Sequence, residues 1–342
     1  MTKPEPKLTH MPEHIQQLIV DRSDSKTKKS VGFLSKDFHD FVKKSPMEYY
    51  CLSLMINISQ VDVVALSDIS NRMFTMEFHP HERGALMRNR TSKWEKILEG
   101  EDYRKAAAHY FLAFFNHPKT KVEIQRIDFY KGYIRASIHR DPDTTKFEAN
   151  RNVVFDEMHT ILKRFRFPLL VETIDFSCKV SEVHILQILP YLKPGTLRTI
   201  NLNFSFPCYM DNAARPNLDL TAVVETDQWK QAERLLANSY KTNLLLEKWT
   251  HARKVTLMWT EPMATLKNVV ETFINTPKLQ KLDIEFNGSW DETDFVDYIV
   301  PLAGDYKSHS ICVVLPSEPG FYIGMDYSST MITIERNKDQ LY

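Results

Sequence analysis

The sequence predicts an α/β protein in which a small helical unit at the N-terminus precedes an irregular α/β solenoid with a largely parallel sheet. Short segments of alternating aliphatic and polar residues recur through the second half of the chain, and this period of two is typical of strands. Helical patterns precede most of these segments. A helix between two strands of one sheet makes those strands parallel, with a right-handed crossover.

The helical unit is predicted over residues 8–48, after a polar tail at residues 1–7. Pro12 suits the first turn of a helix, where its missing N–H is not needed. Two apolar patterns at helical spacing follow, separated by a polar segment. A unit of about 40 residues buries too little surface to be a robust domain, so we expect a partner to complete its apolar surface. The side chains expected in that surface are Leu8, Met11, Pro12, Ile15, Leu18, Ile19, Phe33, Leu34 and Phe38.

A connecting segment is predicted over residues 49–115. Alternation at residues 51–58 and again at residues 72–78 predicts two strands of a hairpin or small sheet. Residues 92–95, Ser-Lys-Trp-Glu, have the form of a capping box, which predicts that a helical region begins there. After an interruption, the apolar spacing predicts a helix over residues 103–115.

Residues 116–342 are predicted to form the repeat-like domain. Its strand-like segments begin at Ile127, Ile174, Ile200, Val255, Leu282 and, more weakly, Ile311. Three intervals between these starts, of 26, 27 and 29 residues, match the period of a leucine-rich repeat, and the other two, of 47 and 55 residues, are about double it. Such repeats bury their apolar faces only by stacking, which predicts an irregular solenoid.

Helices are predicted near residues 182–192, 227–236, 266–275 and 292–300, from their caps and apolar spacing. In the second of these, Trp229 is expected to be a core anchor, with Leu235 and Leu236 packed inward and Gln228 at the periphery.

Strand polarity identifies a candidate surface. Because side chains alternate along a strand, Ile200 and Leu202 are expected to face the helices and Asn201 the opposite, concave face. Taken singly, each outward residue is an ordinary solvated strand residue. Together they form a candidate substrate-binding surface that consists of Asn201, Asn203, Thr256, Met258, Asp283 and Glu285.

Composition excludes several classes of function. The 44 Lys and Arg residues balance 44 Asp and Glu residues, so no global basic field attracts nucleic acid or an anionic membrane. We find no phosphate-binding glycine motif, nucleophile elbow or zinc-protease motif. The nearest metal-like cluster, residues 79–82, reads as a solvated turn. We expect no enzyme activity, cofactor, metal or membrane span, and the absence of an apolar leader predicts a cytoplasmic or nuclear location.

The helical unit of residues 8–48 resembles an F-box, the motif that docks substrate adaptors onto the Skp subunit of cullin-RING ubiquitin ligases. The matching residues are Met11-Pro12-Glu13, Ile15, Leu18-Ile19 and the later Val31 to Val42 pattern. Met11 stands where most F-boxes carry Leu, and Phe38 stands where many carry Trp. The resemblance implies that the apolar side chains of residues 8–48 contact Skp.

The second half resembles the FTH domain, which follows F-boxes in a large nematode family. The matching segments are residues 188–197, 227–232 (Asp-Gln-Trp-Lys-Gln-Ala) and 249–252, with an upstream likeness over residues 111–129. Together the two resemblances cover roughly residues 8–287.

The first functional hypothesis is therefore an adaptor that binds Skp, and through it a cullin, with its F-box and holds a protein substrate of unknown identity with its FTH domain. An alternative is an interaction module outside any ligase, in which the helical unit of residues 8–48 only caps the solenoid. A third reading is an RNA-binding protein, based on the basic and aromatic residues at 163–167. Two arguments disfavour it: cations are also common at helix C-termini, and the net charge of the chain is zero.

Overall fold

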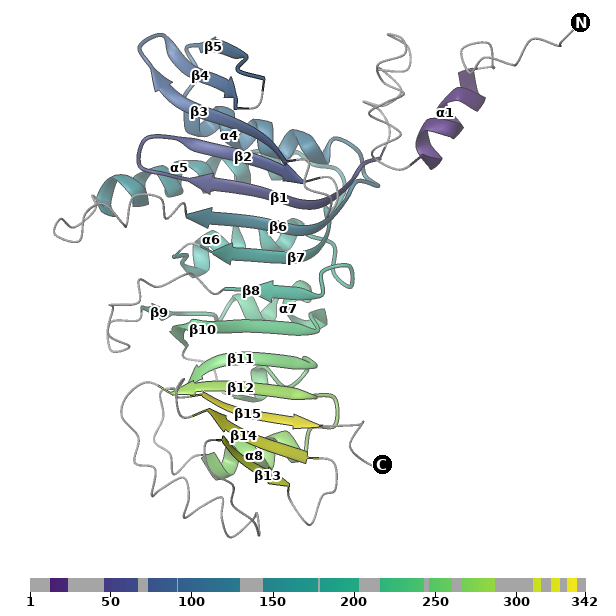
Figure 1. Cartoon of the computed structure of the whole chain (residues 1–342), viewed down its shortest axis with the longest axis vertical. Coiled ribbons are helices and arrows are strands. Elements are labelled where there is room, and N and C mark those ends of the chain that lie inside the picture. Colours follow the sequence, from purple (N-terminus) through teal and green to yellow (C-terminus); the bar gives the residue numbers. More distant parts are fainter. Residues whose placement is uncertain are drawn as a thin grey trace, which may run out of the picture. The chain divides into compact units, whose positions relative to one another are not determined.

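The computed structural model describes residues 13–23, 46–66, 73–90, 92–129, 144–177, 179–202, 216–242, 246–259, 266–286, 310–314, 321–326 and 331–336. It is a mixed α/β protein in which strands far outnumber helices (Figure 1). The chain divides into two compact units: the N-terminal unit, Met1–Glu172 with Tyr191–Thr196, and the C-terminal unit, Thr173–Pro190 with Leu197–Tyr342. The predicted α/β class is confirmed, whereas the helical F-box and the solenoid are not.

The N-terminal unit contains one mixed sheet. Its strands lie in the order β6 (Lys121–Phe129), β1 (Glu48–Ile56), β2 (Val61–Leu66), β3 (Met73–His81), β4 (Gly84–Asn89) and β5 (Glu95–Glu99). Only the β1–β6 pair is parallel, and the others are antiparallel. The strands predicted at residues 51–58 and 72–78 are β1 and β3. They belong to a small sheet rather than one hairpin, because β2 pairs with both.

The helix predicted to begin at the capping box of residues 92–95 is wrong. Asn89 and Ser92 form a turn instead, in which the Ser92 N–H donates to Asn89 Oδ1 at 2.8 Å. Lys93 then takes a positive φ of 55°, and residues 95–99 pair with β4 as an antiparallel strand. A capping-box pattern specifies a helix only when the following residues lack a better partner, and here β4 supplies that partner.

Two helices cover one face of this sheet. The predicted helix at residues 103–115 is confirmed as α4 (Tyr103–Leu112) with the 3₁₀ turn η2 (Ala113–Phe115). α5 (Thr144–Leu162) is the helix expected to end at the basic residues 163–167, and its buried Phe147, Val154, Phe155, Met158 and Leu162 lie at helical spacing. α4 packs on β1 to β4 and on α5, behind the strands as seen in Figure 1.

The C-terminal unit has a sheet with a parallel and an antiparallel part. The parallel part consists of β7 (Leu170–Ser177), β8 (Thr199–Asn201), β10 (Arg234–Thr242), β11 (Lys254–Trp259) and β12 (Lys281–Phe286). β15 (Met331–Arg336), β14 (Phe321–Asp326) and β13 (Ser310–Val314) continue it antiparallel. The predicted parallel sheet is therefore confirmed for the middle of the repeat region, and the weak segment at Ile311 is an antiparallel strand. β9 (Asn217–Leu218) pairs with the end of β10.

The helix predicted over residues 227–236 is wrong in its second half. α7 (Asp227–Gln231) begins at its cap Thr226, whose hydroxyl accepts from Trp229 N at 3.3 Å. The backbone becomes extended at Ala232, and the N–H of Arg234 donates to Arg198 O at 2.9 Å. β10 then alternates in burial. This missed strand divides the 55-residue interval between Ile200 and Val255, because tertiary pairing with β8 and β11 outweighs a pattern that also fits a helix.

Short helices connect the remaining strands. They are α6 (Glu182–Leu186), capped by Ser181 as predicted, η4 (Leu189–Tyr191), η6 (Val223–Glu225), η7 (Leu246–Lys248) and α8 (Leu266–Ile274). α8 confirms the helix predicted from residue 266, with Val269, Val270 and Phe273 buried. The helix predicted at residues 292–300 lies outside the described residues. Among the described residues, each helix is too short or too polar to cross a lipid bilayer.

The core of the C-terminal unit is a row of aliphatic residues in register across neighbouring strands. Ile174, Ile200, Leu235, Val255, Leu282 and Ile334 are paired from β7 to β15, and each is at most 1% exposed. This row confirms the predicted inward face of the strands. The residues between them project from the opposite face, which we call the groove face.

Candidate functional site

The groove face carries a row of polar side chains in register across five neighbouring strands. In β7 to β12 these residues are Thr173, Thr199, Arg234, Lys254 and Lys281. Neighbouring strands lie about 4.8 Å apart, so the three cations stand side by side. Together with four residues of the next row, Asn201, Leu236, Thr256 and Asp283, they line a groove of about 410 Å³.

The second row lies two residues further along each strand. It consists of Asp175, Asn201, Leu236, Thr256, Asp283 and Thr333. Asp175 accepts from the hydroxyl of Ser177 at 2.7 Å and from Asn201 Nδ2 at 3.2 Å. Asp283 accepts from the hydroxyls of Thr333 at 2.7 Å and Thr256 at 3.4 Å. Both carboxylates are therefore supplied with donors from the sheet itself.

The cations of the groove differ in their surroundings. Lys281 Nζ lies 3.5 Å from Asp283 and 3.8 Å from Glu335. Arg234 and Lys254 are exposed, and no described residue forms an ion pair or hydrogen bond with the side chain of either. The groove thus presents two adjacent positive charges beside a half-buried Leu236.

Three of the six residues of the predicted substrate surface line this groove: Asn201, Thr256 and Asp283. Glu285 is half-buried and lies outside the lining. Asn203 lies outside the described residues. Met258, expected on the open face, is only 2% exposed. Next to it β10 is irregular: the four steps from Ala237 to Lys241 stand against one step of β11, from Leu257 to Met258.

Sequence reasoning missed Arg234, Lys254 and Lys281, the residues that give the groove its charge. Extending the period of two backwards from Thr256 and Asp283 finds Lys254 and Lys281. Arg234 gave no such signal, because its segment was assigned to a helix. Leu236, expected in the core, is half-buried and lines the groove instead.

The predicted Skp-binding residues are described only in part. Ile15, Leu18 and Ile19 lie in α1 (Glu13–Arg22), which confirms a helix at this position. Leu18 is 43% exposed, whereas Val20, two residues later, is fully buried. The remaining residues of that set, Leu8, Met11, Pro12, Phe33, Leu34 and Phe38, lie outside the described residues.

The segments that resemble FTH motifs pack against one another. The indole rings of Trp229 and Trp249 form an edge-to-face pair with centroids 5.0 Å apart, and both residues are 1% exposed. Trp229 Nε1 donates to Lys248 O at 3.2 Å, and His251 Nε2 lies 2.7 Å from Trp229 O. Burial lowers the pKa of His251, so its neutral form donates this hydrogen bond. The expectation that Trp229 is a core anchor is confirmed.

Gln228, expected at the periphery, is 6% exposed, and its Nε2 donates to Pro190 O at 3.2 Å. That expectation was wrong because the short helix α7 places Gln228 against η4. Residues 228–229 of the motif are thus structural: they hold α7 to the connections that precede β8 and β11.

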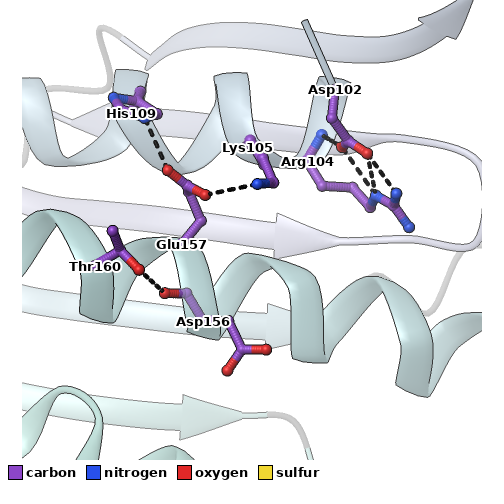
Figure 2. A network of polar contacts seen from close by, with 7 residues as sticks. All are labelled: Asp102, Arg104, Lys105, His109, Asp156, Glu157 and Thr160. Carbon is purple, nitrogen blue, oxygen red and sulfur yellow. Dashed lines mark hydrogen bonds and ion pairs between the residues drawn. The ribbon is translucent and has the colours of Figure 1, made fainter.

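A polar network in the N-terminal unit joins α4 to α5 (Figure 2). Glu157 of α5 lies 3.2 Å from Lys105 Nζ and 3.0 Å from His109 Nε2 of α4. At the start of α4, Asp102 accepts from the backbone and guanidinium of Arg104. Arg104 Nη1 donates to Asn150, whose Nδ2 donates to the carbonyls of Asn57 and Ile58 at 2.9 Å each. The network holds α4 and α5 together and joins them to the turn between β1 and β2.

Residues 79–82, the nearest metal-like sequence, form the end of β3 and the turn into β4. His79 Nε2 lies 3.5 Å from Glu77. In the described part of the chain, no three His, Cys, Asp or Glu side chains converge in a way that would hold a metal ion.

A comparison with protein families matches residues 152–298 to the FTH domain. The match includes the parallel strands β7 to β12, the Trp229–Trp249 pair and every residue that lines the groove. It does not include residues 8–48, so the F-box remains a prediction. No curated protein matches this chain. Residues 152–298 are therefore an FTH domain, which suggests an F-box-associated role in protein interaction.

Proposed function

We propose that this protein is a substrate adaptor of a Skp/cullin/F-box ubiquitin ligase. Its N-terminal segment binds Skp, and its FTH domain binds the protein substrate through the groove. The adaptor performs no bond chemistry itself and acts by proximity, because it holds substrate lysines near a recruited ubiquitin-conjugating enzyme. The observation that carries the proposal is the FTH domain at residues 152–298, downstream of a segment that resembles an F-box.

The exposure of Leu18 supports the docking part of the proposal. A leucine that is 43% exposed on a helix of ten residues is available to a partner. Covering a large apolar side chain completely contributes about 1.5–3 kcal/mol. Ile19 is half-buried in the chain, so it offers less new burial than Leu18.

The test places a charge at the exposed leucine. The full chain is co-expressed with Skp, and the complex is recovered through a tag on Skp. Leu18→Glu is expected to reduce recovery at least tenfold, because a carboxylate would be desolvated in an apolar contact. Gln17→Glu introduces the same charge one position earlier and is expected to leave recovery unchanged. Equal recovery of both variants and the wild-type chain would refute Skp docking through α1.

A second candidate function, an interaction module outside any ligase, is favoured by the complete burial of Val20. Val20 of α1 is thus already covered by the chain, as a residue in the helix of a cap would be. Removal of residues 1–23 separates the two functions. A cap is needed for the N-terminal unit to fold, so cooperative unfolding would be lost, whereas a docking module leaves it intact.

A further inference from the structure

We propose that the groove of the C-terminal unit binds an extended peptide segment with a carboxylate side chain over Arg234 and Lys254 and an apolar side chain over Leu236. The inference rests on the proposed function, because it names the kind of substrate segment that the adaptor captures. It follows from three observations: unpartnered charge, an apolar gap in a polar row, and the spacing between them.

The unpartnered charge of the groove is positive. Arg234 and Lys254 occupy register positions opposite each other on neighbouring parallel strands. At a strand spacing of about 4.8 Å their charges repel, and no described side chain neutralises either one. A carboxylate has two oxygens that accept from separate donors, so it bridges an Arg and a Lys at this separation.

The two carboxylates of the second row do not serve this purpose. Asp175 accepts from Ser177 and Asn201, and Asp283 accepts from Thr256 and Thr333. Lys281, the third cation of the row, lies near Asp283 and Glu335. One end of the cation row is therefore balanced internally, and the middle is left for a ligand.

Leu236 interrupts the second row with an apolar surface. Its register partners are Asn201 on β8 and Thr256 on β11. A half-buried leucine between an amide and a hydroxyl gives a ligand an apolar contact with hydrogen-bonding groups on both sides. The amide of Asn201 and the hydroxyl of Thr256 already donate to Asp175 and Asp283, so the leucine side chain is the feature of this row that the ligand contacts.

The spacing specifies the ligand. Arg234 and Leu236 are two residues apart on β10, so their side chains are separated by about 6.6–6.8 Å along the strand. An extended peptide repeats its side chains on one face at the same distance. A segment that runs in the same direction as β10, the orientation that we infer, places residue i over the cations and residue i+2 over the leucine. The recognised pattern is an acidic residue, any residue, and an apolar residue.

Charge also discriminates against a nucleic acid as the ligand. A single-stranded nucleic acid needs a continuous track of cations and aromatic stacking platforms. The groove offers two unpartnered cations, and the carboxylates of Asp175, Asp283 and Glu335 lie beside them on the same two rows. A polyanion would be repelled at both ends, whereas a single carboxylate is not.

The test uses the full chain and fluorescein-labelled decapeptides of Gly and Ser with a central Glu-Ala-Leu, Lys-Ala-Leu or Glu-Ala-Ser segment. Binding is measured by fluorescence anisotropy at low salt. The wild-type chain is expected to bind the Glu-Ala-Leu peptide about tenfold more tightly than the Lys-Ala-Leu peptide. Two exposed ion pairs together contribute about 1.4 kcal/mol of binding free energy, which corresponds to that factor. The Glu-Ala-Ser peptide is expected to bind more weakly than the Glu-Ala-Leu peptide, because it lacks the apolar contact.

The decisive variant is Arg234→Glu with Lys254→Glu, which is expected to invert the preference so that the Lys-Ala-Leu peptide binds more tightly. Arg198→Glu with Lys278→Glu is the matched control, since both residues are exposed and outside the groove lining. It changes the net charge equally and is expected to keep the wild-type preference. Both variants are checked for wild-type thermal unfolding, which exposed substitutions should preserve.

Equal binding of the acidic and basic peptides, or a preference that is not inverted by the groove variant, would overturn the inference. Tighter binding of a ten-nucleotide oligouridylate than of the acidic peptide would overturn it in favour of a nucleic-acid site. The assay contains no Skp, so a failure of Skp docking leaves its result intact, and a failure of peptide binding leaves the Skp result intact.

Discussion

Asp62 provides a stringent test of the structure, because it is an acidic residue on a central strand that is only 7% exposed. It lies on β2 opposite Glu77 of β3, and both of its oxygens accept from Gln60 Nε2, at 2.9 and 3.1 Å. Burial raises the pKa of Asp62 from 3.8 to about 6, with a further rise from Glu77; the bond from Gln60 and the charges of His79 and Arg90 act against it.

The raised pKa gives a sign and a magnitude for the effect on stability. Because the folded pKa lies above the unfolded value of 3.8, the fold favours protonated Asp62. The ionised form therefore destabilises the fold progressively as the pH rises from about 4 to about 6, and fully above that. A rise of about two units in the pKa lowers the free energy of unfolding by at most about 3 kcal/mol when Asp62 is ionised. Asp62→Asn removes this charge but keeps only one acceptor for Gln60, so we expect a net gain of about 1–2 kcal/mol at pH 7.5.

The assay is urea unfolding of the full chain at pH 5.0 and pH 7.5. Asp62→Asn is expected to raise the free energy of unfolding at pH 7.5 and to give a smaller gain, or none, at pH 5.0. Glu101→Gln, which removes a carboxylate from an exposed position of the same unit, is the control for the loss of one negative charge. A gain of equal size at both pH values, or a loss of stability at pH 7.5, would refute the reasoning.

Three further substitutions test the packing, each by the free energy of unfolding from urea titration. Trp229→Phe removes the buried donor to Lys248 O and is expected to destabilise by about 1–3 kcal/mol; no loss would contradict its role as a core anchor. Arg336→Met removes the guanidinium that donates to carbonyl oxygens at the end of α8, and a loss of about 2 kcal/mol is expected. Gly84→Ala places a Cβ 2.2 Å from Leu98 O, whereas a Cβ at Gly100 meets nothing within 4 Å. We expect Gly84→Ala to cost several times the roughly 1–2 kcal/mol of Gly100→Ala, whose φ of 72° is the main penalty, and equal losses would contradict the close approach at Gly84.

Much of the secondary structure was accessible from the sequence. The period of two around Ile174, Ile200, Val255 and Leu282 predicted four strands of the C-terminal sheet and the face that each buries. Helical spacing similarly predicted α4 and α8. These elements could be predicted because their own residues carry the apolar face that the core covers.

Other elements could not be predicted from the sequence, because a helix and a strand both fit the same local pattern. Leu235 and Leu236 fit the apolar face of a continued α7 as well as a strand, and pairing with β8 and β11 decided between them. Residues 92–95 fit a helix start, and pairing with β4 made residues 95–99 a strand. Local preferences of a few tenths of a kcal/mol yield to a complete ladder of hydrogen bonds and its packing.

The sequence alone determined which residues of each strand share a face, and thus that Asn201, Thr256 and Asp283 leave the core together. Only the tertiary structure decided which strands are neighbours, and therefore that Arg234 stands beside Lys254 and that Leu236 lies between Asn201 and Thr256. Alternation along a strand is a local consequence of backbone geometry. The order and register of strands depend on contacts between residues far apart in the chain, which no local pattern encodes.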